Sequence, residues 1–211
     1  LLANIADNHH RGPDFFEKIW KILKKLKNEI LHYFSNLSIF NIFKNNKRVL
    51  LLLIENEMLV IDKTITSITK NDYPQYFFKQ IKPFIDKEER EILSSCLPMN
   101  YEELQEIGEN DSYVCKLIRE DLIDEFSSFV KKENIDLFDS INSSIFETNP
   151  FLIGKELSFI EYATFFGSLK IVKYLHKNKV ELKPSLWLYA IHSQNLDTIQ
   201  FLNENNVEPE D

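Results

Sequence analysis

Several residues that could carry chemistry are present, but their spacing forms no recognisable catalytic or metal-binding motif. His9 and His10 are adjacent, so their side chains point in different directions, and no cysteine or carboxylate at metal-ligand spacing accompanies them. His32, His176 and His192 each stand alone in a helical pattern, where a surface or partly packed histidine is the usual state. We therefore expect no metal site and no cofactor.

Paired carboxylates such as Glu102 and Glu103 could act as a general acid and base, but such pairs arise readily in a chain with 27% charged residues. The sequence contains no glycine-rich phosphate loop, no G-x-S-x-G and no H-E-x-x-H. It therefore predicts a protein that is not an enzyme. An unrecognised enzyme or effector is the alternative, and it would need a deep pocket lined by convergent polar groups.

The composition predicts helices that bury an ordinary core. The chain has 211 residues, enough for one large domain or two small ones, and 44% are hydrophobic. With only 4 glycines and 7 prolines, long helices joined by short loops are favoured over strands and turns. The longest apolar run, residues 49–54, is too short to span a bilayer.

The charge and the cysteines bear on partners and location. The net charge is −8, without the basic excess of proteins that bind nucleic acid, so we expect no nucleic acid and no membrane as partner. Cys96 and Cys115 lie among apolar neighbours, which favours buried reduced thiols in a cytoplasmic protein over a single disulfide. Leu1 at the start and the abrupt end at Asp211 suggest a fragment.

Residues 1–110 are expected to form a helical N-terminal region. Asp14 is a candidate N-cap for a helix whose apolar positions recur at three- and four-residue steps on one face, while lysines cover its other surfaces. A basic amphipathic helix can bind a membrane or a calmodulin-like partner, but a solvated lysine face on a core helix is the simpler interpretation. The apolar positions are Phe16, Ile19, Leu23, Leu26, Ile30, Phe34 and Leu37.

Further helices are expected within the same region. A helix pair is predicted between residues 38 and 61, and another helix at residues 86–97 with Ile92, Leu93 and Cys96 inward. Asn100 is a candidate cap for the next short helix, which Gly108 would end. We place the domain boundary after residue 110, and residues 135–157 read as an extended loop or hairpin.

An internal repeat is the strongest signal in the chain. Residues 158–163 match residues 185–190 at an offset of 27 (190 − 163), without insertions. The same offset pairs Leu169 with Leu196, Val172 with Ile199, Leu175 with Leu202, Asn178 with Asn205 and Val180 with Val207. A weaker copy, offset by 122 (175 − 53), places Val49, Leu50, Leu53, Asn56 and Met58 on Ile171, Val172, Leu175, Asn178 and Val180.

The first copy resembles an ankyrin repeat, whose pattern T-P-L-H-x-A-A-x-x-G-H precedes a second helix. Ser158 can cap the first helix, the small Ala163 lets two helices approach, and Gly167 ends the helix without a steric penalty. Three residues depart from the pattern, and the 27-residue period is shorter than the usual one of about 33. The short period implies that no full β-hairpin separates the copies. The departures are Phe159 for Pro, Glu161 for His and Lys179 for Gly.

Residues 161–168 and 185–192, together with the opening residues 6–12, are similar to an expanded family of ankyrin-repeat proteins of parasitic protists, whose helical N-terminal region is uncharacterised. The resemblance implies an all-α fold: an ankyrin-like solenoid of helix pairs with an irregular helical N-terminal region. Ankyrin-like repeats would occupy residues 111–211, most clearly 158–182 and 185–209, and residues 1–110 would include a degenerate helix pair at most.

Family membership further implies a scaffold that binds an unidentified protein through the concave repeat surface, with no small-molecule ligand. In ankyrin repeats the two positions before the helix-ending glycine face that surface, which here are Phe165 and Phe166, then His192 and Ser193 in the next copy. Exposed aromatic side chains would be favoured contacts. The alternative is a purely structural N-terminal cap for further repeats, in which the two phenylalanines pack inside.

Overall fold

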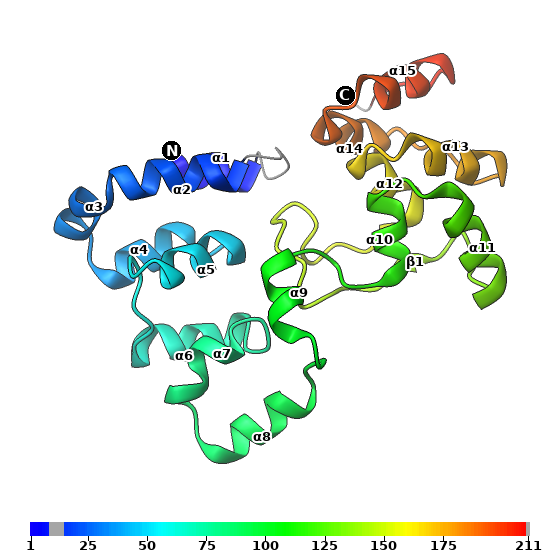
Figure 1. Cartoon of the computed structure of the whole chain (residues 1–211). Coiled ribbons are helices and arrows are strands. Elements are labelled where there is room, and N and C mark those ends of the chain that lie inside the picture. Colours follow the sequence, from blue (N-terminus) through cyan, green and yellow to red (C-terminus); the bar gives the residue numbers. More distant parts are fainter. Residues whose placement is uncertain (9–14, 210–211) are drawn as a thin grey trace. The chain divides into compact units, whose positions relative to one another are not determined.

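The structure is a computed structural model that describes residues 1–8 and 15–209 (Figure 1). Helices make up 62% of the chain, and the described residues include just two short strands, so the predicted all-α class is confirmed. His9, His10 and the candidate cap Asp14 lie outside the described residues.

The chain divides into two compact units: Leu1–Glu109 with Ile145–Ile153, and Asn110–Ser144 with Gly154–Asp211. The break after Glu109 lies one residue from the expected boundary. The predicted loop 135–157, however, is shared between the units. Its middle part joins the first unit because Thr148 donates to the Gly108 carbonyl from its backbone N–H (3.1 Å) and its hydroxyl (2.7 Å).

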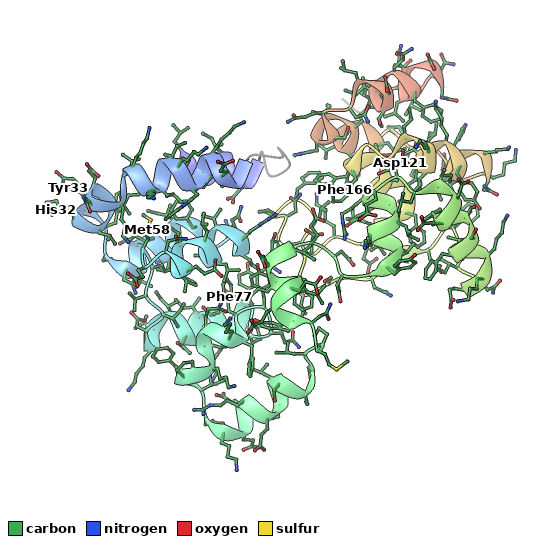
Figure 2. The ribbon with its side chains drawn as sticks, in the orientation of Figure 1. His32, Tyr33, Met58, Phe77, Asp121 and Phe166 are labelled. Atoms are coloured by element: carbon green, nitrogen blue, oxygen red, sulfur yellow. The ribbon has the colours of Figure 1, made fainter. Side chains whose placement is uncertain are left out.

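The first unit is an assembly of short helices around one core. Its apolar residues come from most of its helices, and Met58 and Phe77, labelled in Figure 2, are among the most deeply buried. The elements are α1 (Leu2–Asn8), α2 (Phe15–Lys25), α3 (Lys27–Tyr33), α4 (Asn36–Phe43), α5 (Lys47–Glu55), α6 (Lys63–Asp72), α7 (Phe78–Ile81), a 3-10 turn (Lys82–Phe84), α8 (Lys87–Ser95) and α9 (Tyr101–Ile107).

The predicted continuous apolar face of the first long helix is interrupted after residue 25, although Ile30 still packs partly buried against the core. At Leu26 the backbone leaves the helical conformation (φ −97°, ψ 8°), so α2 and α3 are separate helices. Ile19 and Leu23 on α2 enter the core, whereas Leu26 and Phe34 are 45% and 46% exposed. α3 contains no buried residue.

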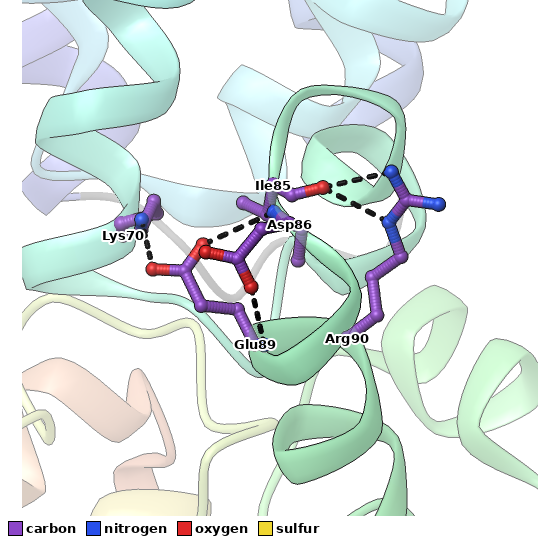
Figure 3. A network of polar contacts seen from close by, with 5 residues as sticks. All are labelled: Lys70, Ile85, Asp86, Glu89 and Arg90. Carbon is purple, nitrogen blue, oxygen red and sulfur yellow. Dashed lines mark hydrogen bonds and ion pairs between the residues drawn. The ribbon is translucent and has the colours of Figure 1, made fainter.

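Polar contacts hold α8 at its N-terminal end (Figure 3). Asp86 and Glu89 form a capping box, Lys70 pairs with Glu89, and the Arg90 guanidinium donates twice to the Ile85 carbonyl at 3.0 and 2.8 Å. No residue of α8 is fully buried, but Leu93, which was predicted to point inward, packs partly buried against the core.

The predictions for Ile92, Cys96 and Asn100 are wrong. Ile92 is 59% exposed and Cys96 is exposed as well, although both were expected to point inward; Cys115 is buried as predicted. Asn100 makes no side-chain cap, because its backbone (φ −96°, ψ 30°) is not in the extended conformation of a capping residue.

The second unit contains three helix pairs in sequence. α12 packs against both α10 and α14, so the first helices of the pairs lie side by side (Figure 1). A two-residue antiparallel ladder, Ser140 with Ser158 and Ile141 with Leu157, precedes the second pair. Residues 178–185 contain no strand, as the short period predicted. The elements are α10 (Tyr113–Arg119), α11 (Ile123–Glu133), β1 (Ser140–Ile141), β2 (Leu157–Ser158), α12 (Phe159–Phe166), α13 (Leu169–Lys177), α14 (Leu186–Ser193) and α15 (Leu196–Glu204).

Ser158 begins α12 and Gly167 ends it, as predicted. The Ser158 hydroxyl accepts from the Glu161 N–H, and the Glu161 carboxylate accepts from the Ser158 N–H at 2.9 Å, a complete capping box. Gly167 has a left-handed backbone (φ +67°), and a Cβ there would lie 2.9 Å from the Asn195 Cβ. The Asn195 amide donates to the Gly167 carbonyl at 2.8 Å, so the glycine is also where the second and third pairs meet.

A residue of the first pair caps the second helix of the next pair. Asp121 follows α10 with a positive φ of 51°, and its carboxylate accepts from the backbone N–H groups of Lys170 (3.2 Å) and Ile171 (3.0 Å) in the first turn of α13 (Figure 2). A carboxylate there offsets the positive end of the helix dipole. Neighbouring pairs are thus joined by polar contacts as well as by apolar packing.

Candidate functional site

The four residues predicted to contact a partner lie together in the second unit. The Phe165 ring centroid is 5.7 Å from that of His192 and 5.2 Å from that of Phe166, and Phe166 is 4.6 Å from Tyr162. The Ser193 hydroxyl donates to the Ala190 carbonyl at 2.7 Å and accepts from the Asn195 N–H at 3.1 Å.

Phe165, however, is a core residue and is wrong as a contact. It is only 1% exposed, because α12 is covered on both sides and the ring of His192, its equivalent in the next pair, lies over it. Phe166, His192 and Ser193 are half-buried, and Figure 2 labels Phe166. This end of the pairs therefore offers a small accessible surface.

A pocket lies at the other end of α12, where this helix begins. It has a volume of about 580 Å³ and is lined by residues of the 137–140 segment, the first turns of α12 and α14, and the connection 179–185. Its floor includes Ile160, Val180 and Leu186, which are all buried, while Phe138 at its rim is 64% exposed. None of the four predicted contact residues lines this pocket.

Local backbone chemistry positions the walls of the pocket. Pairing of Ser140 with Ser158 holds the 137–140 segment beside the start of α12. On the opposite side Lys179 adopts a positive φ of 73°, which turns the chain so that the Val180 N–H donates back to Leu175 at 3.1 Å. Val180 is thereby directed into the floor.

Charges of both signs surround this apolar floor. Glu156, Glu181 and Lys183 are exposed lining residues, and the Glu161 carboxylate of the capping box also reaches the lining. The pocket can therefore take an apolar side chain into its floor while its rim makes polar contacts, which is the usual composition of a protein-binding surface.

The negative charge of Glu161 affects the pKa of two neighbouring side chains, Lys155 and Tyr189. Burial lowers the pKa of Lys155, and the Glu161 charge partly opposes this effect. Burial also raises the pKa of Tyr189, and Glu161 raises it further. The Lys155 ammonium lies 6.0 Å from the centroid of the Tyr189 ring. A cation, an aromatic ring and a carboxylate thus lie close together near the pocket.

The described residues show neither a metal-binding cluster nor a membrane-spanning helix. They contain no group of three or more histidine, cysteine, aspartate and glutamate side chains placed to hold a metal ion. Among the helices of the described chain, none combines the length and apolar character needed to cross a bilayer. Comparison with protein-family models, curated proteins and solved structures gave no match to the chain.

Part of this pocket could have been found from the sequence. Ser158 and Glu161 have the spacing of a capping box, which marks the start of α12 and hence one wall. Phe138 carries no such signal, because a single phenylalanine in an irregular segment is usually a core residue. Its exposure becomes evident only in the folded structure.

Proposed function

We propose that the second unit is an ankyrin-like stack of helix pairs that binds a protein partner through the pocket under Phe138. The observation that carries the proposal is an accessible pocket of about 580 Å³ whose buried floor of Ile160, Val180 and Leu186 lies below an exposed aromatic side chain. Aromatic side chains beside apolar pockets are typical centres of binding energy in protein interfaces.

The partner that fits is a polypeptide segment with an apolar anchor residue and charged neighbours. The apolar floor would take the anchor, and the mixed charges of Glu181 and Lys183 favour a segment with both signs of charge. A cytoplasmic location for this interaction stays a prediction from the two cysteines.

A phage-displayed library of random peptides would test the proposal. Peptides selected on the native chain should lose about tenfold in affinity for a Phe138→Ser variant, since an aromatic side chain that packs over a bound segment is worth about 1.4 kcal/mol. Leu196→Ser is the matched control, because Leu196 is 77% exposed in the same unit and does not line the pocket.

A third variant, Phe166→Ser, separates the two ends of the helix pairs. Loss of binding in Phe138→Ser alone would support the pocket. Loss in Phe166→Ser alone would return the site to the originally predicted surface of Phe166, His192 and Ser193. Selected peptides that bind all variants equally would refute the proposal.

A second candidate, a structural cap that carries further helix pairs, is supported by the open face of α14. Leu188 and Ile191 on this helix are 51% and 63% exposed. Ile191 is equivalent to Thr164 of the preceding pair, which is fully buried beside α14. An uncovered apolar face of this kind is expected to cause self-association of the isolated chain. If the face serves only to carry another helix pair, Leu188→Ser with Ile191→Ser should reduce that self-association in sedimentation velocity and leave peptide binding unchanged.

A further inference from the structure

Apolar side chains at one end of the first unit protrude into solvent. α3 and the residues just after it expose Leu31 (46%), Tyr33 (76%), Phe34 (46%) and Leu37 (39%), and α3 buries no residue at all. In Figure 2 Tyr33 lies at the outer end of α3, next to His32. Four large apolar side chains within seven residues form a patch that ordinary surface composition does not explain.

The same part of the chain is strongly basic although the whole protein is acidic. Between residues 15 and 37 five lysines outnumber the two carboxylates Glu17 and Glu29, and Glu17 pairs with one of the lysines, Lys21. The lysines are Lys18, Lys21, Lys24, Lys25 and Lys27. Lys18, Lys24 and Lys25 on α2 are exposed, and between them Ile22 exposes 44% of its surface. Basic and apolar groups are thus interleaved along α2 and α3.

We propose that this surface, formed by α2, α3 and residues 34–37, docks on the interface of an anionic lipid bilayer. Exposed Tyr, Phe, Leu and Ile side chains insert at the boundary between headgroups and acyl chains, while neighbouring lysines contact acidic headgroups. The net charge of −8 argued against an anionic membrane, but the local field of this segment has the opposite sign.

A bilayer fits the patch better than an acidic protein helix does. The exposed residues Leu31, Tyr33, Phe34 and Leu37 follow one another across the end of α3 and the bend at Phe34, whose backbone is extended (φ −118°, ψ 134°). They therefore do not form the i, i+3, i+4 stripe that another helix would match. A fluid interface accepts protruding side chains without a complementary shape.

Co-sedimentation of the full chain with vesicles tests this inference. Vesicles of phosphatidylcholine with about 30% phosphatidylserine should bind the protein, and pure phosphatidylcholine should bind it far less. Replacing Lys18, Lys24 and Lys25 together by Gln should lower the partition coefficient on the order of a hundredfold, at about fivefold for each lysine near the surface.

The apolar contribution is tested with two triple variants of equal size. Leu31→Ser, Tyr33→Ser and Phe34→Ser should abolish binding. The control combines Phe84→Ser, Ile92→Ser and Met99→Ser, which are also exposed in the first unit but lie outside the basic segment, and it should bind as the native chain does. Circular dichroism checks that both variants keep the native helicity.

Absence of binding to the phosphatidylserine vesicles, or equal losses in the two triple variants, would overturn the inference. So would capture by an acidic calmodulin-like protein that depends on the same residues while vesicles do not bind. The outcome is independent of the pocket in the second unit, since none of these substitutions lies there.

Discussion

Replacing Lys47 by methionine should remove a pH dependence of stability that the first unit owes to one buried ammonium group. Lys47 is 4% exposed, and its Nζ donates to the Ile145 carbonyl at 2.8 Å. The rings of Tyr76 and Tyr73 lie 4.7 and 5.5 Å from Nζ. These contacts compensate burial only in part, and burial lowers the pKa of Lys47 from 10.5 to about 8, against the opposing charge of Glu147.

The sign of the effect follows from proton binding. Below pH 8 Lys47 is charged in both the folded and the unfolded chain, and the folded state bears a cost of roughly 3 kcal/mol. As the pH rises through the folded pKa of about 8, the folded state loses its proton while the unfolded state, with a pKa near 10.5, keeps it. The free energy of unfolding therefore increases with pH, by roughly 2 kcal/mol between pH 7 and pH 9.5.

Urea denaturation at several pH values, followed by the fluorescence of Trp20, would measure this gain. A Trp187→Phe background restricts the signal to the first unit, because the chain has only 2 tryptophans and Trp187 lies in the second. Comparing Lys47→Met with its parent at each pH cancels the contribution of every titrating group that does not interact with Lys47. Loss of the hydrogen bond to the Ile145 carbonyl lowers the free energy of unfolding of Lys47→Met by about 1 kcal/mol at all pH values. Parallel stability curves for the two proteins would refute the reasoning.

Three further predictions concern the helix junctions of the second unit, each checked by thermal or urea denaturation. Gly167→Ala should destabilise it by about 2–4 kcal/mol because its Cβ would meet Asn195, whereas Gly154→Ala, with nothing within 4 Å, should cost only the left-handed strain of about 1 kcal/mol; equal effects would contradict the close approach. Asp121→Ala should cost about 1 kcal/mol by uncapping α13, and Asp121→Asn should retain most of the stability, so equal losses would exclude capping. Lys179→Gly should stabilise by about 0.5 kcal/mol by relieving the positive φ, while Lys177→Gly at the last residue of α13 should destabilise; loss of stability at both positions would show that Lys179 is not strained.

The helix boundaries could be predicted where local chemistry decides them. Ser158 and Gly167 act as capping and terminating residues because a hydroxyl acceptor and a left-handed backbone suit those positions in any context. Burial could not be predicted in the same way. The pattern placed Phe165 beside a groove. The burial of its side chain, however, depends on the ring of His192, which lies 27 residues further along the chain. The interruption of the core face at Leu26 depends on one backbone bend, which the apolar periodicity does not reveal.

One element of the repeat occurs in both units and supports the weak alignment at an offset of 122 residues. Glu57, Lys179 and Asn206 all have a positive φ, and after each of them an apolar residue donates its N–H to a carbonyl five residues back. In each turn the preceding asparagine also donates its side-chain amide to the carbonyl four residues back. These amide bonds join Asn56 to Leu52 (2.7 Å), Asn178 to Tyr174 (2.8 Å) and Asn205 to Phe201 (2.8 Å).

The positive φ and the bond five residues back are a general way to end a helix, because Asp121, Asn134 and Gly167 are followed by the same bond after α10, α11 and α12. The asparagine amide bond is the more specific feature, and it is what α5 shares with α13 and α15. The end of α5 thus has the same local geometry as the ends of α13 and α15. The surroundings of this turn differ in the first unit, where α4 packs against α6 as well as α5, and where α3 contributes only the partly buried Ile30 to the core.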